Sequence, residues 1–316
     1  MKLPKLIIIT GPTASGKTAL SLKLAKKIHG EIISADSRQI YRGMDIGTAK
    51  PSRDQRSKIK DQNFYSKGIR HHLIDIRNPD QPYTLAEFKR DAIKAINTIA
   101  KRGRVPFLVG GTALYIWAIL ENPEIPEVKP NSKFRNLLER QLQRHGVQYL
   151  YKKLILKDPE AACIIDPKNP RRIIRALEIM HATGKPFSDS RKKGASLFDC
   201  MVLGMKLPPA KLKKIIKLRA AQQLRSNLIS EVRRLTKKYG IQRQAFDAIG
   251  YREIISHLNG QISKAEALKQ IQNNTWHFAG RQMTWFKKLP IEWIKNYKQA
   301  ETKIKTHLFL PLEGGG

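Results

Sequence analysis

The chain has 316 residues, of which 41% are hydrophobic and 27% charged, proportions typical of a folded globular protein. Its 60 lysines and arginines against 26 aspartates and glutamates give a formal net charge of +34, which favours a polyanionic partner unless the whole proteome is basic. Two cysteines, Cys163 and Cys200, are too few for a disulfide framework or a zinc module, so we expect a reducing, cytoplasmic setting. The longest apolar stretch, residues 105–120, is too short and too glycine-rich for a membrane span, and no signal peptide is predicted.

The first 117 residues alternate short apolar runs with helical patterns, which is typical of a parallel α/β sheet. Thr84 and Glu87 have the spacing of a capping box, which predicts the start of one of the helices. The predicted strands are 6–10, 31–35, 72–76 and 105–109, and the predicted helices between them are 19–28 and 84–101.

A helical block interrupts this pattern between residues 118 and 185, with predicted helices at 132–145, 148–156 and 171–182. A strand predicted at 201–207 follows. We therefore expect residues 118–185 to form a mostly helical insertion domain within one α/β core made of residues 1–117 and 186–307. Helices are predicted again beyond Pro209, including a long one that begins at Ser263, and the tail, residues 308–316, is expected to be disordered.

Residues 11–18 read GPTASGKT, a full match to the phosphate-loop (P-loop) pattern G-x-x-x-x-G-K-[ST] between a strand and a helix. Glycines at both ends let the backbone turn its amides toward an anion, Lys17 adds a mobile positive charge, and Thr18 offers a hydroxyl to Mg²⁺. The predicted anion-binding residues are Gly11, Pro12, Thr13, Ala14, Ser15, Gly16, Lys17 and Thr18. The pattern predicts binding of a diphosphate or a nucleotide such as ATP without deciding between them, and a purely structural glycine turn is the alternative.

Asp36 comes directly after the second predicted strand. Because the carboxyl ends of parallel strands meet at one edge of a sheet, we expect it to face the same crevice as the glycine loop. Two alternatives are an aspartate that caps a turn and an acid that orients Mg²⁺-bound water. Asp75, at the end of the third strand, is the other acid placed where nucleotide-hydrolysing enzymes hold Mg²⁺.

Longer motifs accompany the glycine loop through most of the chain. They are SADSRQIYRGMDIGTAKP (34–51), HHLIDI (71–76), LVGGTALY (108–115), DPEAA (158–162), RRIIRALEI (171–179), AIGYRE (248–253) and RQMTWF (281–286). In this order the chain resembles the tRNA dimethylallyltransferase (tRNA isopentenyltransferase) family over roughly residues 5–290. The resemblance implies a P-loop core with a parallel sheet and a helical insertion, Mg²⁺ as cofactor, and transfer of a dimethylallyl group from dimethylallyl diphosphate to the N6 amine of the adenosine 3′-adjacent to the tRNA anticodon.

The resemblance also implies roles for individual residues. Asp36 matches the family's general base, and Arg219 matches a diphosphate-contacting arginine that acts with Lys17 and with Thr18, the Mg²⁺ ligand. A competing interpretation is that Arg219, like the arginines of 171–175, is a solvated charge on a basic helix. The tRNA contacts implied by the resemblance are Asp36, Ser37, Arg38, Gln39, Thr112, Arg171, Arg172, Ile173, Ile174 and Arg175.

The chain departs from the family pattern near two of these regions. Ala221 and Asn227 stand where the family has Asp and Gly, close to Arg219, and Asn169 stands where it has Asp. Some basic residues of the family are also missing between 275 and 281, so the RNA role of that helix stays open. Its neighbouring aromatic residues fit either a base-stacking platform or a core: Trp276, Phe278, Trp285 and Trp293.

Two other functions remain as alternatives. A P-loop kinase of a nucleoside or small metabolite would use the same loop, and a non-catalytic RNA-binding NTPase would use both the loop and the positive charge. His71 and His72 are not predicted to share a metal ion, because adjacent strand residues point to opposite faces. We expect a monomer that binds the anticodon stem–loop of tRNA and dimethylallyl diphosphate, with no membrane partner.

Overall fold

The computed structural model describes residues 3–54, 64–128 and 131–309. The chain divides into two compact units, one made of Met1–Leu120 with Leu197–Gly316 and the other of Glu121–Ser196. Within the described residues, no helix combines the length and the apolar character that crossing a membrane requires.

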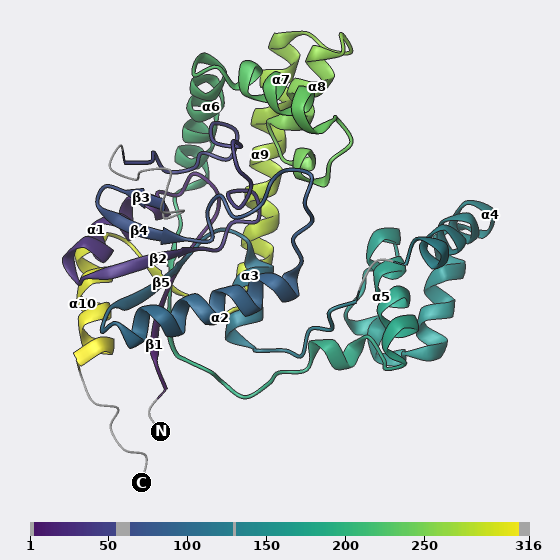
Figure 1. The fold of residues 1–316 in the computed structure, drawn as a ribbon, viewed down its shortest axis with the longest axis horizontal. Coiled ribbons are helices and arrows are strands. Elements are labelled where there is room, and N and C mark those ends of the chain that lie inside the picture. The colour runs from purple at the N-terminus through teal and green to yellow at the C-terminus, as the bar shows by residue number, and fades with distance from the viewer. Residues whose placement is uncertain (1–2, 55–63, 129–130, 310–316) are drawn as a thin grey trace. The chain divides into compact units, whose positions relative to one another are not determined.

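The first unit is built on a seven-stranded sheet in the order β3-β4-β2-β5-β1-β6-β7. Figure 1 labels its strands from β3 to β1. Neighbouring strands are parallel, except that β3 pairs with β4 in the antiparallel sense. The strands are β1 (Lys5–Thr10), β2 (Gly30–Ser34), β3 (Phe64–Ser66), β4 (Ile69–His72), β5 (Val105–Val109), β6 (Asp199–Met205) and β7 (Glu292–Ile294). The three central strands therefore end side by side, at Thr10, Ser34 and Val109.

Helices cover both faces of the sheet, which explains why its central strands are apolar on both sides. Ile7 and Ile9 pack with α1 (Lys17–Lys27) and α10 (Tyr297–Phe309) on one face. On the other face, Leu6 and Ile8 pack with the helices α2 (Leu85–Lys101) and α3 (Ala113–Leu120) and with Phe286, the last residue of α9 (Lys264–Phe286). The alternation of β1 residues between the two cores is the period of two expected of a strand.

The remaining helices of this unit are α6 (Pro209–Arg225), α7 (Leu228–Tyr239) and α8 (Tyr251–Leu258), with a 3₁₀ turn at Gln244–Asp247. Together with α9 they enclose Ile40, Tyr41 and Met44, which follow β2, in a third apolar cluster. Asn227 joins α6 to α7 with φ 68°. Because asparagine is, after glycine, the residue that best tolerates this left-handed conformation, it can stand where the family has glycine.

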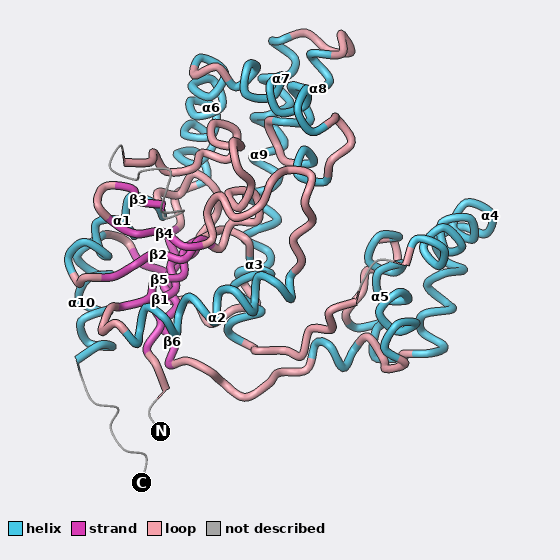
Figure 2. The backbone as a smooth tube through the Cα atoms, viewed as in Figure 1, coloured by secondary structure: helices cyan, strands magenta, loops and turns pink. Residues whose placement is uncertain are grey.

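The second unit consists, within its described residues, of helices and loops (Figure 2). Its helices are α4 (Ser132–Lys157) and α5 (Pro170–Thr183), with 3₁₀ turns at Pro159–Cys163 and Ser188–Arg191. Gly146, with φ 77° and ψ 174°, breaks α4 into two pieces, as the two predicted helices required. Asn169 caps α5 by accepting the Arg172 amide, a position where asparagine and aspartate are about equally favourable.

The predicted fold class, an α/β P-loop core with a parallel sheet and a helical insertion, is confirmed. The predicted boundaries of the insertion, 118–185, are wrong, because its compact unit runs from Glu121 to Ser196. Ile119 packs into the core beside the sheet, and Phe187 packs into the core of the insertion. Burial of these two side chains moves both ends of the insertion toward the C-terminus.

Two other expectations need correction. The third strand is β4, which ends at His72 rather than spanning 72–76, because Leu73 (φ 61°) and Asp75 (φ 57°) leave the extended conformation. A disordered tail was expected over 308–316, but Leu308 and Phe309 complete α10; residues 310–316 lie outside the described part of the chain. The short strands β3 and β7 and the helix α10 carry no sequence signal that we recognised.

Candidate active site

The loop between β1 and α1 curls because three of its residues have a positive φ. Gly11 (φ 144°), Ala14 (φ 64°) and Gly16 (φ 94°) redirect the backbone just before α1 begins at Lys17. Gly11 also has no room for a side chain, since a Cβ there would lie 2.2 Å from the Met205 carbonyl oxygen. Backbone amides gathered at a helix N-terminus in this way form a site for a phosphate anion.

Two cations from distant parts of the sequence share an electrostatic environment with Asp36. Desolvation lowers the pKa of Lys17 to about 8, an effect that Asp36 opposes and Arg219 reinforces, and Lys17 Nζ donates to the Pro12 carbonyl at 3.0 Å. Desolvation also lowers the pKa of Arg219, and the Asp36 carboxylate again opposes the shift. Cations that have lost water bind an incoming anion more strongly than cations in bulk solvent.

Asp36 lies just beyond β2 and is held through only one of its oxygens. Oδ1 accepts the backbone amides of Arg38 at 2.9 Å and Gln39 at 3.4 Å, whereas Oδ2 makes no hydrogen bond within the described part of the chain. The guanidinium of Arg38 is itself anchored by the Gln244 carbonyl at 2.8 Å. One carboxylate oxygen therefore caps the turn, which was one of the two alternatives given for Asp36 in the sequence analysis. The second oxygen is left to accept a proton.

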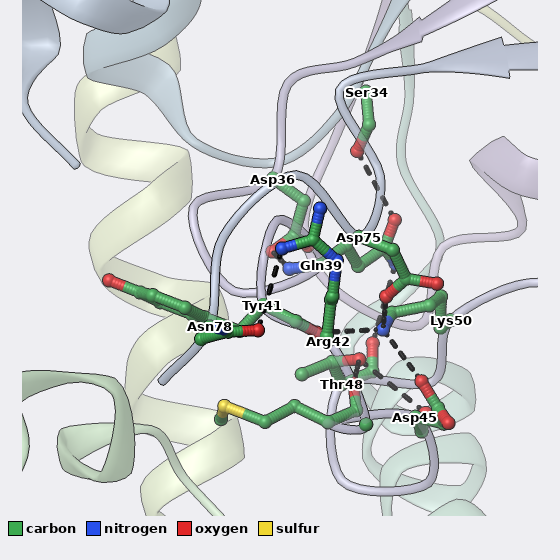
Figure 3. A network of polar contacts seen from close by, with 12 residues as sticks. Ser34, Asp36, Gln39, Tyr41, Arg42, Asp45, Thr48, Lys50, Asp75 and Asn78 are labelled. Atoms are coloured by element: carbon green, nitrogen blue, oxygen red, sulfur yellow. Dashed lines mark hydrogen bonds and ion pairs between the residues drawn. The ribbon is translucent and has the colours of Figure 1, made fainter. Parts of the chain in front are cut away.

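The residues around Asp36 are tied to the neighbouring loops. The Ser37 amide donates to Thr112 Oγ1 at 3.1 Å, which joins the loop after β2 to the loop after β5. Gln39 accepts a hydrogen bond from Ser34 Oγ at 3.2 Å and donates to the Thr48 carbonyl at 3.4 Å (Figure 3). These bonds fix the backbone on which the predicted base-contacting side chains stand.

Lys50 joins three further groups of this polar network (Figure 3). Its Nζ contacts Asp45 Oδ1 at 2.6 Å, Asp75 Oδ1 at 2.5 Å and the Tyr41 carbonyl at 2.9 Å, and its side chain is 2% exposed. Asp75 therefore belongs to an ion pair that folds the loop onto the sheet, and it does not line the cavity that holds Lys17. The sequence-based alternative of Asp75 as the Mg²⁺ acid is wrong for this reason.

Glu231 of α7 supports the cavity wall through hydrogen bonds that the sequence analysis did not predict. Its carboxylate accepts the backbone amides of Asp45 (3.0 Å), Ile46 (2.8 Å) and Gly47 (3.2 Å) and the hydroxyl of Tyr251 (2.6 Å). The three amide bonds anchor the DIGT segment, part of which lines the cavity, and the fourth ties Glu231 to Tyr251 of α8. The available signal was an acid on the buried stripe of an otherwise basic helix.

A cavity of about 710 Å³ joins these groups. The predicted residues that line it are Thr13, Ala14, Gly16, Lys17, Thr18, Asp36, Ser37, Arg38, Gln39, Thr112 and Arg219. Gly11, Pro12 and Ser15 are buried in the loop itself rather than on the cavity wall. Three residues of α9 also line the cavity: Phe278, for which the sequence left a stacking platform or a core open, and Arg281 and Gln282, which had no predicted role.

The arginine-rich motif predicted to contact tRNA lies on α5 of the insertion. Arg171 and Arg172 are exposed, and Arg175 Nη1 lies 3.5 Å from Glu178 Oε2. Ile173 and Ile174 are 0% and 7% exposed, respectively, and belong to the apolar core of the insertion. Their side chains therefore face this core, because a helix that presents its arginines to solvent turns these two residues inward, and their predicted contact with tRNA stays a prediction.

Within the described residues, no group of three or more His, Cys, Asp or Glu side chains could hold a metal ion. His72 Nε2 instead pairs with Glu31 Oε2 at 2.7 Å, and His71 Nδ1 lies 3.0 Å from the Ile69 carbonyl. A magnesium ion beside the glycine loop would therefore depend on the Thr18 hydroxyl and on oxygens of a bound diphosphate. Mg²⁺ commonly accepts such a set of oxygen donors.

The mostly parallel sheet, the curled glycine loop and the facing carboxylate define a P-loop protein of the α/β class, with an anion-binding loop and an acidic side chain in one cavity. The sequence model of the IPP transferase family matches residues 39–289. Two relatives named tRNA dimethylallyltransferase support the same assignment. That of Roseiflexus sp. is 44% identical, with 90% of each chain covered, and that of Bacillus subtilis is 38% identical, with 97% of each covered.

Solved structures agree with the sequence relatives. The full-length tRNA isopentenylpyrophosphate transferase from Bacillus halodurans aligns with a TM-score of 0.67 and 37% identity over 96% of this chain and 95% of that one. A eukaryotic dimethylallyltransferase described as acting on tRNA aligns with a TM-score of 0.76 and 26% identity, covering 96% of this chain and 78% of that one. This chain belongs to the tRNA dimethylallyltransferase family, also named the IPP transferases, which are prenyl transferases.

Proposed function

We propose that this protein transfers a dimethylallyl group from dimethylallyl diphosphate to the N6 amine of the adenosine 3′-adjacent to the tRNA anticodon, giving N6-isopentenyladenosine. The observation that carries the proposal is a single cavity in which the glycine loop, Lys17 and Arg219 lie beside Asp36. A diphosphate leaving group and a proton acceptor are the two groups that this reaction needs, and membership of the tRNA dimethylallyltransferase family supplies the substrate class.

In the transfer step the N6 nitrogen forms a bond to the allylic carbon of the donor while the bond from that carbon to the diphosphate oxygen breaks. The electron pair of the broken bond leaves with the diphosphate, and the N6 proton passes to Oδ2 of Asp36. The amine is a weak nucleophile, because its lone pair is delocalised into the ring. Removal of its proton as the new bond forms is therefore worth ~10²–10⁴-fold in rate.

The charge that develops on the leaving diphosphate is met by the loop amides and by two cations, Lys17 and Arg219. Preorganised donors of this kind stabilise the transition state because they need no reorganisation when the charge appears. Thr18 would hold Mg²⁺ through its hydroxyl, and the ion when bound would neutralise part of the diphosphate charge. Thr13 lines the same cavity and is placed to contact the donor.

The target adenosine has to leave its stack in the anticodon loop to reach Asp36, which costs a few kcal/mol. We assign its recognition to Ser37, Arg38, Gln39 and Thr112, which line the cavity around Asp36. Exposed arginines of α5, Arg171 and Arg172 among them, are proposed to bind tRNA phosphates and so position the RNA without reading its sequence.

The test is incubation of the protein with unmodified tRNA, Mg²⁺ and radiolabelled dimethylallyl diphosphate. We expect label in the RNA at the adenosine next to the anticodon, and tRNA in which that adenosine is replaced by guanosine serves as the control. Absence of label would refute the proposal, and phosphate transfer from ATP to a nucleoside would favour the kinase alternative. We also propose that the protein acts as a monomer in the cytoplasm, where Cys163 and Cys200 remain free thiols.

A further inference from the structure

Gln282 of α9 is buried, with 5% of its surface exposed, yet both ends of its amide are bonded to the backbone of other segments. Its Oε1 accepts the Thr13 amide at 2.8 Å, and its Nε2 donates to the Gly111 carbonyl at 2.7 Å. Both distances are short for N–H···O bonds, and a primary amide can accept through its oxygen while it donates through its nitrogen.

The two backbone groups belong to loops that serve different substrates. Thr13 lies in the glycine loop, the proposed diphosphate site, whereas Gly111 precedes Thr112, which accepts the Ser37 amide at 3.1 Å. The Thr112 amide also donates to the Ala35 carbonyl at 3.2 Å, directly before Asp36. A continuous run of hydrogen bonds therefore joins the donor side of the cavity to the base side, and Gln282 is the side chain that spans the gap between the two loops.

The glycines of the LVGGT motif make this close approach possible. A Cβ on Gly111 would lie 2.4 Å from Nε2 of Gln282, and a Cβ on Gly110 would lie 2.1 Å from the Ala35 carbonyl oxygen. Neither position can carry a side chain without moving its neighbours. The spacing between the glycine loop and the loop after β5 is thus matched to the length of one glutamine side chain.

We propose that Gln282 is a positioning residue for the transfer reaction, which sets the distance between the bound diphosphate and the Asp36–Thr112 side of the cavity. This inference rests on the proposed function. In-line attack needs the amine nitrogen about 3–3.5 Å from the allylic carbon, and an error of about 1 Å in such a geometry can cost ~10²-fold in rate. Since Gln282 touches two loop backbones rather than the reacting atoms, its loss should lower kcat more than it weakens tRNA binding.

The experiment compares Gln282→Met and Gln282→Glu with a matched control, Gln272→Met. Gln272 stands on the same helix, and its amide donates at 3.4 Å to the Lys217 carbonyl, outside both loops. For Gln282→Met we expect a ~10–100-fold fall in kcat, a tRNA dissociation constant within about twofold of wild type, and wild-type kcat in the control. Circular dichroism melting shows what fraction of each variant is folded at the assay temperature.

Gln282→Glu separates positioning from simple loss of stability. An ionised carboxylate accepts the Thr13 amide but cannot donate to the Gly111 carbonyl, whereas a protonated one can do both. Burial raises the pKa of such a glutamate, so we expect activity relative to wild type to recover as the pH falls from 8 to 6. A structural role alone would give no such recovery in protein that is folded at both pH values.

Three results would overturn the inference: unchanged kcat in Gln282→Met, a fall in kcat that matches the unfolded fraction, or a Gln282→Glu activity ratio that is flat with pH. If Gln282→Met does not fold, the Gln282→Glu pH profile still decides. Failure of the proposed function can be told apart from failure of this inference, because in that case the wild-type protein itself would leave the tRNA unlabelled.

Discussion

Replacement of Asp36 by asparagine isolates the proton-accepting role of its free oxygen. Oδ1 of Asp36 accepts the amides of Arg38 at 2.9 Å and Gln39 at 3.4 Å, and an asparagine oxygen can keep both hydrogen bonds. The loop after β2 should therefore retain its course. At the other position the substitution places an NH₂ group, which donates hydrogen bonds and cannot take the N6 proton.

The expected loss follows from that exchange. General-base assistance is worth ~10²–10⁴-fold, so Asp36→Asn should reduce kcat at least ~10²-fold, or about 2.7 kcal/mol in activation free energy. A second effect acts on the donor. Asp36 raises the pKa of Lys17, which is about 8 in the wild type. Replacing the Asp36 carboxylate by a neutral amide therefore lowers the pKa of Lys17 further. The donor KM should rise as a consequence, and more so at pH 8 than at pH 7.

The assay is steady-state transfer of labelled dimethylallyl groups to tRNA at pH 7, combined with a filter-binding measurement of tRNA affinity. Asp247→Asn is the matched control, because Asp247 lines the same cavity, is itself exposed at the end of a 3₁₀ turn, and has no role in the proposed chemistry. The control should keep wild-type kcat, and Asp36→Asn should keep wild-type tRNA affinity. Near-normal turnover in Asp36→Asn would refute the assignment of the base.

Three further predictions concern pH and salt. The Lys17 pKa of about 8 means that kcat/KM for the donor should decline between pH 7 and 9 as Lys17 loses its proton, and that Lys17→Arg should show little of this decline; a flat wild-type profile would contradict it. Burial lowers the pKa of His71 from 6.5 to about 4, so between these pH values the unfolded chain binds a proton at His71 that the folded chain does not. The free energy of unfolding therefore decreases as the pH is lowered through this range. From pH 7 to pH 5 the loss due to His71 is about 2 kcal/mol, and urea unfolding of His71→Gln should show a correspondingly smaller drop; equal drops would argue against this cause. Finally, tRNA affinity should fall linearly in a log–log plot against salt, measured by filter binding, because phosphate contacts release counterions; a weak dependence would mean that the positive charge serves another purpose.

Local sequence determined the parts of this protein whose conformation depends on near neighbours. The glycine loop curls because Gly11 and Gly16 stand where positive φ is needed, and Lys17 then opens a helix. Thr84 and Glu87 form the predicted capping box, with the Thr84 side chain accepting the Glu87 amide at 3.1 Å. Position at a strand end also sufficed to place Asp36 at the crevice, because parallel strands expose their carboxyl ends together.

The partners of these residues come from far along the chain, and apart from the buried stripe that includes Glu231, no periodic pattern indicates them. Arg219 of α6 shares the environment of Asp36 and Lys17 only because α6 and α9 pack together above the loops. Gln282 and Glu231 each bond to backbone groups more than 150 residues away, contacts that depend on the packing of whole helices. The residue types at these positions are ordinary for surface helices, so composition gives no warning of their burial.

Sequence by itself therefore determined the type of loop, the order of the core elements and the family, since each is encoded in short contiguous motifs. Tertiary structure alone decided that Asp75 pairs with Lys50, that Ile173 and Ile174 face a core, and that the insertion ends at Ser196. The physical reason is that burial and ion pairing are properties of surfaces brought together by folding. A carboxylate is the same in the sequence whether it later meets a lysine, a backbone amide or a substrate.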